Sequence, residues 1–184
     1  MSALVGLYNT IFWGLQRLLE DWFLGLAARL IFASVLLFYF LNSALTKVGS
    51  GFPGSLIPST GAYAQILPQL TESVGYDVSQ IDFFPYGLIV WAGTYGEFLL
   101  PILVVVGLFT RAAALGMIVF IAVMTYVDIT AHQVDAQTIG SFFDRLPNAP
   151  IADQRLMWAF PLLYLVIRGP GIVSLDWIFG RMRR

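Results

Sequence analysis

The residue best placed to do chemistry is Glu97, a lone acid inside a long apolar run. Eleven uncharged residues, 86–96, precede it, and twelve apolar residues, 98–109, follow it. On insertion scales a charged residue at the centre of a membrane helix costs about 2.5–3.5 kcal/mol, so this carboxyl group should face other protein groups. It then either holds helices in register through hydrogen bonds or exchanges protons beside a ligand.

Pro101 adds a second polar group at the same place. Proline lacks the N–H that would bond to the carbonyl four residues earlier, so the carbonyl of Glu97 loses its helical partner. We expect a hydrogen-bond donor from another helix, from water or from a ligand to bind the carboxyl and carbonyl oxygens of Glu97. The protein candidates are a tyrosine, a threonine or Arg29, although helix rise places Glu97 about 10 Å deeper than Arg29.

Further polar residues are expected to converge at the outer end of the apolar segments. Asp128 and His132 lie one helical turn apart and share a face. Because an imidazole titrates near neutrality, this pair could orient a quinone carbonyl or pass a proton. The alternative is a helix end that water and lipid headgroups satisfy. The residues expected at this end are Asn42, Lys47, Asp128, His132 and either Asp153 or Arg155.

Residue counts exclude several kinds of chemistry. The chain has no cysteine and one histidine, which excludes thiol–disulfide exchange, thiolate metal sites and a bis-histidine haem held by this chain alone. Asp128, His132 and Asp135 offer three potential metal ligands, but two lie in a loop, and we assign no metal. No phosphate-binding glycine loop, HExxH motif or basic stripe is present, so nucleic acid is not an expected partner.

Hydropathy places these residues in one integral membrane domain, residues 1–184. The 184 residues are 58% hydrophobic and 11% charged, with a mean hydropathy of +0.78. The expected fold is all-α, an antiparallel bundle of four transmembrane helices. Apolar runs that could cross about 30 Å of hydrocarbon predict spans near residues 22–45, 86–109, 112–130 and 151–168. The fourth is the least regular, because only twelve residues separate Arg155 from Arg168.

Three further segments flank these spans. Residues 1–21 show helical amphipathic spacing and predict a helix lying on the membrane surface. Residues 49–85 are too polar and too broken to cross, and they predict a long periplasmic loop with a short helix near 62–70. Residues 174–184 predict a cytoplasmic tail.

Basic residues predict the orientation in the membrane. Six arginines fall on one side and three basic residues on the other, so both termini should be cytoplasmic. An even number of spans agrees with this. The six are Arg17, Arg111, Arg168, Arg181, Arg183 and Arg184, and the three are Lys47, Arg145 and Arg155.

Three stretches together resemble the DoxX family of small bacterial membrane proteins. They are Arg29 with residues 42–47, the block E-F-L-L-P-I-L-V-V-V-G-L-F-T-R that begins at Glu97, and the ending G-P-G-I-V-S-L-D at 169–176. The resemblance implies a four-helix bundle in the bacterial inner membrane, often associated with redox systems. Relatives include the DoxD-like membrane component of thiosulfate:quinone oxidoreductase.

These observations lead to one preferred function and two alternatives. The preferred function is an accessory or anchoring subunit of a membrane redox complex, adjacent to quinone and without a redox group of its own. Quinone or a bound lipid is the expected small-molecule ligand, and larger redox subunits or a second copy are the expected partners. The first alternative is a quinone-reducing subunit of the thiosulfate:quinone type. The second alternative, a transporter, is less well supported, because inverted repeats are not apparent in the sequence. No catalytic residue is assigned.

Overall fold

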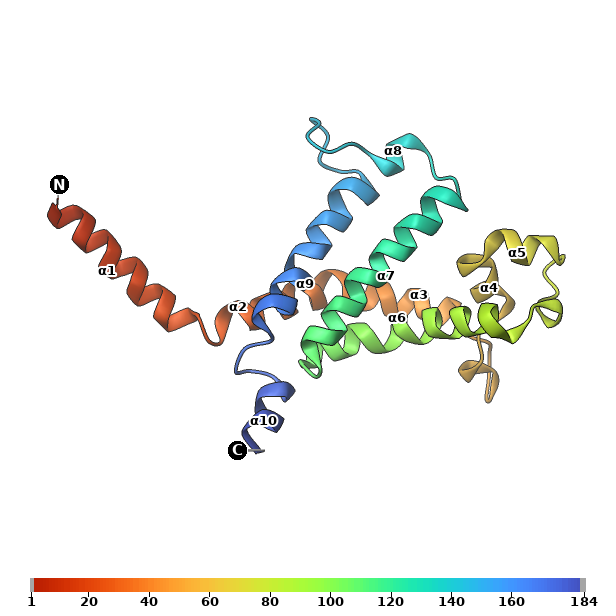
Figure 1. Cartoon of the computed structure of the whole chain (residues 1–184), viewed down its shortest axis with the longest axis horizontal. Helices are drawn as coiled ribbons and strands as arrows, with labels where there is room; N and C mark the ends of the chain where they lie inside the picture. The colour runs from red at the N-terminus through yellow and green to blue at the C-terminus, as the bar shows by residue number, and fades with distance from the viewer. Residues whose placement is uncertain (1, 183–184) are drawn as a thin grey trace.

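A computed structural model describes residues 2–182 of the chain, and within that range the regular structure is helical apart from one isolated bridge between Val48 and Pro58. Four helical elements form the body of the molecule (Figure 1). In chain order they are Phe23–Phe32 (α2) continuing through Phe38–Thr46 (α3), Leu88–Val106 (α6), Thr110–Thr130 (α7) and Leu156–Arg168 (α9).

Three of the helices are long and apolar enough to cross a membrane. They are Phe23–Thr46, Phe83–Val106 and Thr110–Thr130, which lie within a few residues of the first three predicted spans. The segment predicted as the fourth span is also helical, with a π-helical start at Pro150–Arg155 that leads into α9. It is not among those three, because Asp153 and Arg155 in its first turns lower its mean hydropathy.

The four helical elements pack around one core. The α2–α3 helix packs against α6 on one side and α9 on the other, and α7 lies between α6 and α9. Phe32, Leu36, Phe40 and Ala44 are buried at intervals of four residues. A π-helical segment, Ala33–Leu37, interrupts the α-helix there, and its wider turn keeps this four-residue series facing the core.

A tight turn joins α6 to α7. Helix α6 ends at Val106, three residues earlier than predicted, because Gly107 adopts a left-handed conformation with φ of 73°. The amide of Leu108 donates to the carbonyl of Leu103, and the amide of Gly107 donates to Leu103 and Val104. This hydrogen-bond pattern is the Schellman motif, which favours glycine at this position.

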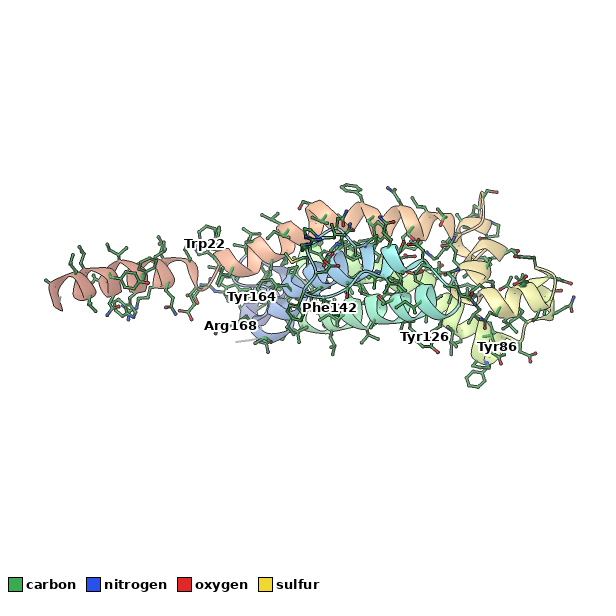
Figure 2. The ribbon with its side chains drawn as sticks, turned by 90° about the horizontal axis from the view of Figure 1, so that it is seen from above. Trp22, Tyr86, Tyr126, Phe142, Tyr164 and Arg168 are labelled. Atoms are coloured by element: carbon green, nitrogen blue, oxygen red, sulfur yellow. The ribbon has the colours of Figure 1, made fainter. Side chains whose placement is uncertain are left out.

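The remaining helices lie at the two ends of the bundle. Helix α1 (Ser2–Leu19) projects away from it, and its apolar side chains are exposed, whereas Met1 of the predicted amphipathic segment lies outside the described residues (Figure 1). Thr60–Ile66 (α4) and Pro68–Ser73 (α5) pack at the opposite end, where a single short helix was predicted; Pro68 begins the second of them. Figure 2 shows Trp22 at the junction with α1 and Tyr86 near the far end.

The C-terminal segment returns to the α6–α7 turn. Leu175–Met182 forms a short helix (α10), within the segment predicted as a tail, whereas Arg183 and Arg184 lie outside the described residues. A four-residue helix, Ala136–Ile139 (α8), lies in the connection between α7 and α9.

Candidate functional site

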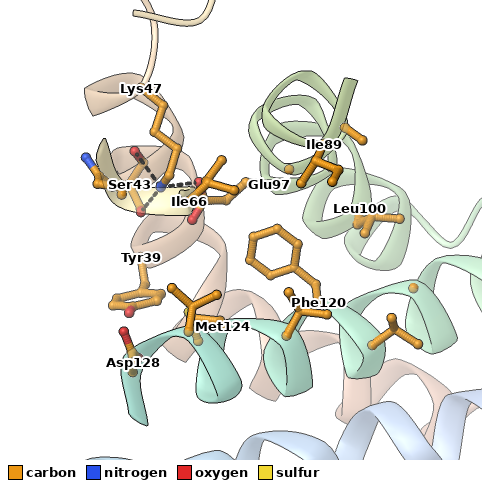
Figure 3. Close-up of a pocket in the computed structure, with 18 of the residues that line it drawn as sticks. Tyr39, Ser43, Lys47, Ile66, Ile89, Glu97, Leu100, Phe120, Met124 and Asp128 are labelled. Carbon is orange, nitrogen blue, oxygen red and sulfur yellow. Dashed lines mark hydrogen bonds and ion pairs between the residues drawn. The ribbon is translucent and has the colours of Figure 1, made fainter. Parts of the chain in front are cut away.

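A cavity of about 500 Å³ lies between α3, α6 and α7, and α4 contributes to its wall. Its volume is in the range of small-molecule sites. Most of the lining is apolar, and Phe120 and Leu100 are among the residues that form it (Figure 3). Four of the six predicted site residues are in the wall. They are Lys47, Glu97, Asp128 and His132.

An ion pair between Lys47 and Glu97 forms the polar part of this wall. The Lys47 ammonium nitrogen lies 2.6 Å from a Glu97 carboxylate oxygen, and the two side chains are 7% and 3% exposed. The ammonium also donates to the hydroxyl of Ser43 at 2.9 Å (Figure 3). Since Ser43 lies one turn back from Lys47, the pair sits beside the last turn of α3. The ion pair therefore joins the last turn of α3 to the interior of α6.

Arg29 is not the partner of Glu97, which corrects one of the sequence predictions. Its guanidinium lies at the opposite end of α6, where it donates twice to the carbonyl of Val105, at 2.7 and 3.1 Å, and once to the carbonyl of Val173. The side chain does not extend outward to water but is buried. Arg29 thus satisfies a carbonyl at the C-terminus of α6 and ties the first span to the C-terminal segment.

The C-terminal segment completes that cluster through Asp176. Its carboxylate accepts hydrogen bonds from the amides of Phe109 and Thr110, at 2.7 and 2.8 Å, and from the Thr110 hydroxyl. An acid at the start of α7 meets unpaired amides and the positive end of the helix dipole. The G-P-G-I-V-S-L-D ending and the Glu-to-Arg block therefore meet at the α6–α7 turn.

Asp128 is paired on the side of the cavity towards α9. The guanidinium of Arg155 donates to the Asp128 carboxylate at 2.5 Å and to the Thr125 hydroxyl at 2.7 Å. His132 contacts the backbone carbonyl of Gln65 through Nε2 at 3.2 Å, which links the end of α7 to α4. Asp128 and His132 thus line one cavity, but each meets a different partner.

Asn42 does not join the predicted cluster. It lies two residues from both Phe40 and Ala44, which are buried, so helix geometry turns its side chain to the opposite, exposed face. Asp153 is also directed elsewhere, since its carboxylate accepts from the amide of Ala149 at the start of the last helix.

The three potential metal ligands do not form a metal site. No group of three ligating side chains occurs within residues 2–182. Asp128 is bound to Arg155, and Asp135 caps helix α8, where hydrogen bonds from the backbone and hydroxyl of Thr138 lower the pKa of its carboxyl group.

Sequence reasoning missed four polar residues of this part of the structure. Tyr39, Ser43 and Gln65 line the cavity, and the hydroxyl of Thr125 accepts a hydrogen bond from Arg155. Ser43 precedes Lys47 by four residues, a spacing that places the two on one helix face, so this contact could have been found. No local signal relates Thr125 to Arg155, because the two lie on different helices.

The helices and this cavity define a class, namely a multi-pass helical membrane protein with a buried ion pair facing an apolar cavity. A model of the DoxX family matches residues 24–133, more than half of the chain, and the chain belongs to the DoxX family. The matched range contains Arg29, Lys47, Glu97 and Asp128. No curated protein and no solved structure matches the chain.

Proposed function

We propose that this chain is an accessory or anchoring subunit of a redox complex in the bacterial inner membrane, with its cavity adjacent to quinone. The observation that carries the proposal is the cavity itself, which combines apolar walls with one polar end formed by Lys47, Glu97 and Ser43. Ligand sites of this kind pair apolar contact with a few positioned polar groups. The DoxX resemblance supplies the redox association, and the lack of cysteine argues against a thiol centre within this chain.

The proposal includes four spans, with α9 as the fourth and both termini in the cytoplasm. Arg155 would otherwise be a costly charge near a helix end, but it is paired with Asp128 across the α7–α9 contact. The cysteine-free chain allows a direct test with single cysteines at Ser2, Ser141 and Gly180. A membrane-impermeant maleimide should label Ser141→Cys from the periplasm, and Ser2→Cys and Gly180→Cys only in inverted vesicles. Labelling of Gly180→Cys from the same side as Ser141→Cys, or of Ser2→Cys from that side, would exclude this topology.

Extraction of native membranes in a mild detergent tests the accessory role. The tagged chain should elute together with larger subunits that carry flavin, haem or iron–sulfur groups, visible in the absorption spectrum of the complex. Cross-linking before extraction provides a control against loss of weak partners. A chain that remains alone both with and without cross-linking would refute the accessory role.

The alternative is a quinone-reducing subunit of the thiosulfate:quinone type, which the buried carboxylate beside the cavity favours. The test compares wild type with the Lys47→Met/Glu97→Leu variant, which removes the protonatable pair without leaving one charge unpaired. If the pair moves protons, the reconstituted complex should lose quinone reduction while the subunit stays folded. Unchanged turnover in this variant would exclude a catalytic role for the pair.

A further inference from the structure

The cavity lies where α6 and α7 separate. The two helices leave a common turn at residues 107–109 and diverge away from it (Figure 1). The cavity lining contains Ile89 on α6 and Val119 and Val123 on α7, and these side chains are 46%, 54% and 55% exposed. Both helices are long and apolar enough to span a membrane. Exposed apolar side chains in such helices face hydrocarbon, so the cavity opens sideways towards the lipid chains.

Small residues create the space behind this opening. Gly93 and Gly96 on α6 and Gly116 on α7 all line the cavity. A Cβ added at Gly96 would lie 3.8 Å from Leu100 and 3.9 Å from Phe120, which is ordinary van der Waals contact. A larger side chain at Gly96 would therefore project into space that is now part of the cavity.

The charges in the wall are balanced. Lys47 is paired with Glu97, and Asp128 is paired with Arg155. An anionic or cationic ligand would bring an extra charge into an apolar site in which no wall charge is left to neutralise it, and an unpaired buried charge is costly. His132, which also lines the cavity, contacts the carbonyl of Gln65.

Neutral hydrogen-bonding groups are present in the wall. The hydroxyl oxygen of Ser43 accepts from Lys47, which leaves its O–H to donate, and Tyr39 adds a phenol (Figure 3). A ligand with uncharged polar atoms at one end and a hydrocarbon chain at the other matches both the polar end and the lateral opening.

We propose that the cavity binds an uncharged, chain-bearing amphiphile that enters from the bilayer between α6 and α7. Its polar head lies beside Ser43, Lys47 and Tyr39, and its chain leaves past Val119 and Val123. This inference rests on the proposed function, because it gives the chemical class and entry route of the ligand adjacent to the redox complex.

Photolabelling of the purified full chain in nanodiscs tests this proposal. The probe is a decyl-benzoquinone with a diazirine in its alkyl chain, and labelled positions are mapped by peptide mass spectrometry. Label should concentrate on the lining residues of α6 and α7. Because 1-dodecanol is uncharged and dodecanoate is an anion with the same chain length, dodecanol should compete at least about tenfold more effectively at equal membrane concentration.

Two variants of α7 provide a matched comparison. Val119→Trp places bulk at the opening, whereas Leu115→Trp places it one turn away on an equally exposed position (52%) that does not line the cavity. We expect labelling to fall about tenfold in the first variant and to remain at the wild-type level in the second. Gly96→Leu should also lower labelling by filling the interior, and equal unfolding temperatures would show that fold is retained.

Three results would overturn the proposal. They are equal labelling of the two tryptophan variants, label spread over all lipid-facing surfaces, and competition by dodecanoate as strong as that by dodecanol. None of these depends on a partner, since the purified chain is used alone. If extraction of native membranes finds no redox partner while the purified chain still shows cavity labelling, the accessory role is refuted and the ligand class stands.

Discussion

The ammonium nitrogen of Lys47 lies 2.6 Å from the carboxylate of Glu97, fifty residues further along the chain. Each group has been removed from water, a step that costs several kcal/mol per ion, and each is stabilised there by the other. The two side chains therefore act as one neutral unit that joins the end of α3 to α6. Removing one member has a different consequence from removing both.

We expect Lys47→Met alone to lower the free energy of unfolding by about 3–5 kcal/mol, because it leaves the Glu97 carboxylate buried without a countercharge. The Lys47→Met/Glu97→Leu variant should recover most of that loss. Denaturant unfolding in detergent micelles, followed by far-UV circular dichroism, measures both values. A double variant as unstable as the sum of the two single variants would contradict the pairing.

Gly107→Ala should destabilise the chain strongly. The residue has φ of 73°, and a Cβ there would lie 2.7 Å from the Cβ of Ser174 and 3.0 Å from Cζ of Arg29. The same substitution at Gly14 is the control, because nothing lies within 4 Å of its added Cβ. Since alanine favours a helix over glycine by about 1 kcal/mol, Gly14→Ala should be neutral or mildly stabilising. Thermal unfolding of both variants checks this, and equal melting temperatures would be inconsistent with it.

Asp176→Ala should loosen the start of α7. The carboxylate accepts two backbone amides and one hydroxyl, so its loss leaves these donors unpaired at a cost of about 1–3 kcal/mol. Hydrogen exchange should accelerate at the amides of Phe109 and Thr110 and stay unchanged in the middle of α7. Glu72→Ala, at an exposed acid in α5, is the control and should leave the exchange at both amides unaltered.

Asp128→Ala should weaken the contact of α9 with α7 more than Thr125→Val does. The first change removes the countercharge of Arg155, whereas the second removes one hydrogen bond to it. A hydrogen bond to a charged group contributes about 1.5–3 kcal/mol to stability. Because the Arg155–Asp128 pair is partly exposed, its contribution should lie near the lower limit of that range. Hydrogen exchange of the segment Leu156–Arg168 is the measurement. The reverse order of effects would show that Arg155 depends chiefly on Thr125.

The sequence was sufficient to place the three long apolar helices, because the apolar runs that define them are local. It located the polar residues of the cavity only in part. Lys47 was predicted among the polar residues at the outer end of the spans, but its contact with Glu97 was not, because that contact depends on how far α6 is shifted along α3. Helix rise alone cannot give that shift, which is also why Arg29 was considered as the partner.

Asn42 and Arg155 illustrate the same limit. The π-helical segment at Ala33–Leu37 rotates the residues that follow it about the helix axis. A regular α-helical pattern therefore does not determine on which side of the helix Asn42 lies. Arg155 was expected only at the same general end of the bundle. Its pairing with Asp128 depends on the packing of α7 against α9, which hydropathy does not specify.

The contact between Arg29 and Val173 has a consequence for biosynthesis. The guanidinium belongs to the first apolar helix, whereas the carbonyl that it meets is 144 residues later. Arg29 is therefore synthesised before either of its acceptors, and the carbonyl of Val105 becomes available to it well before that of Val173. The hydrogen-bond set of Arg29 is complete only when the segment that carries Val173 has been translated and has folded back onto the first apolar helix.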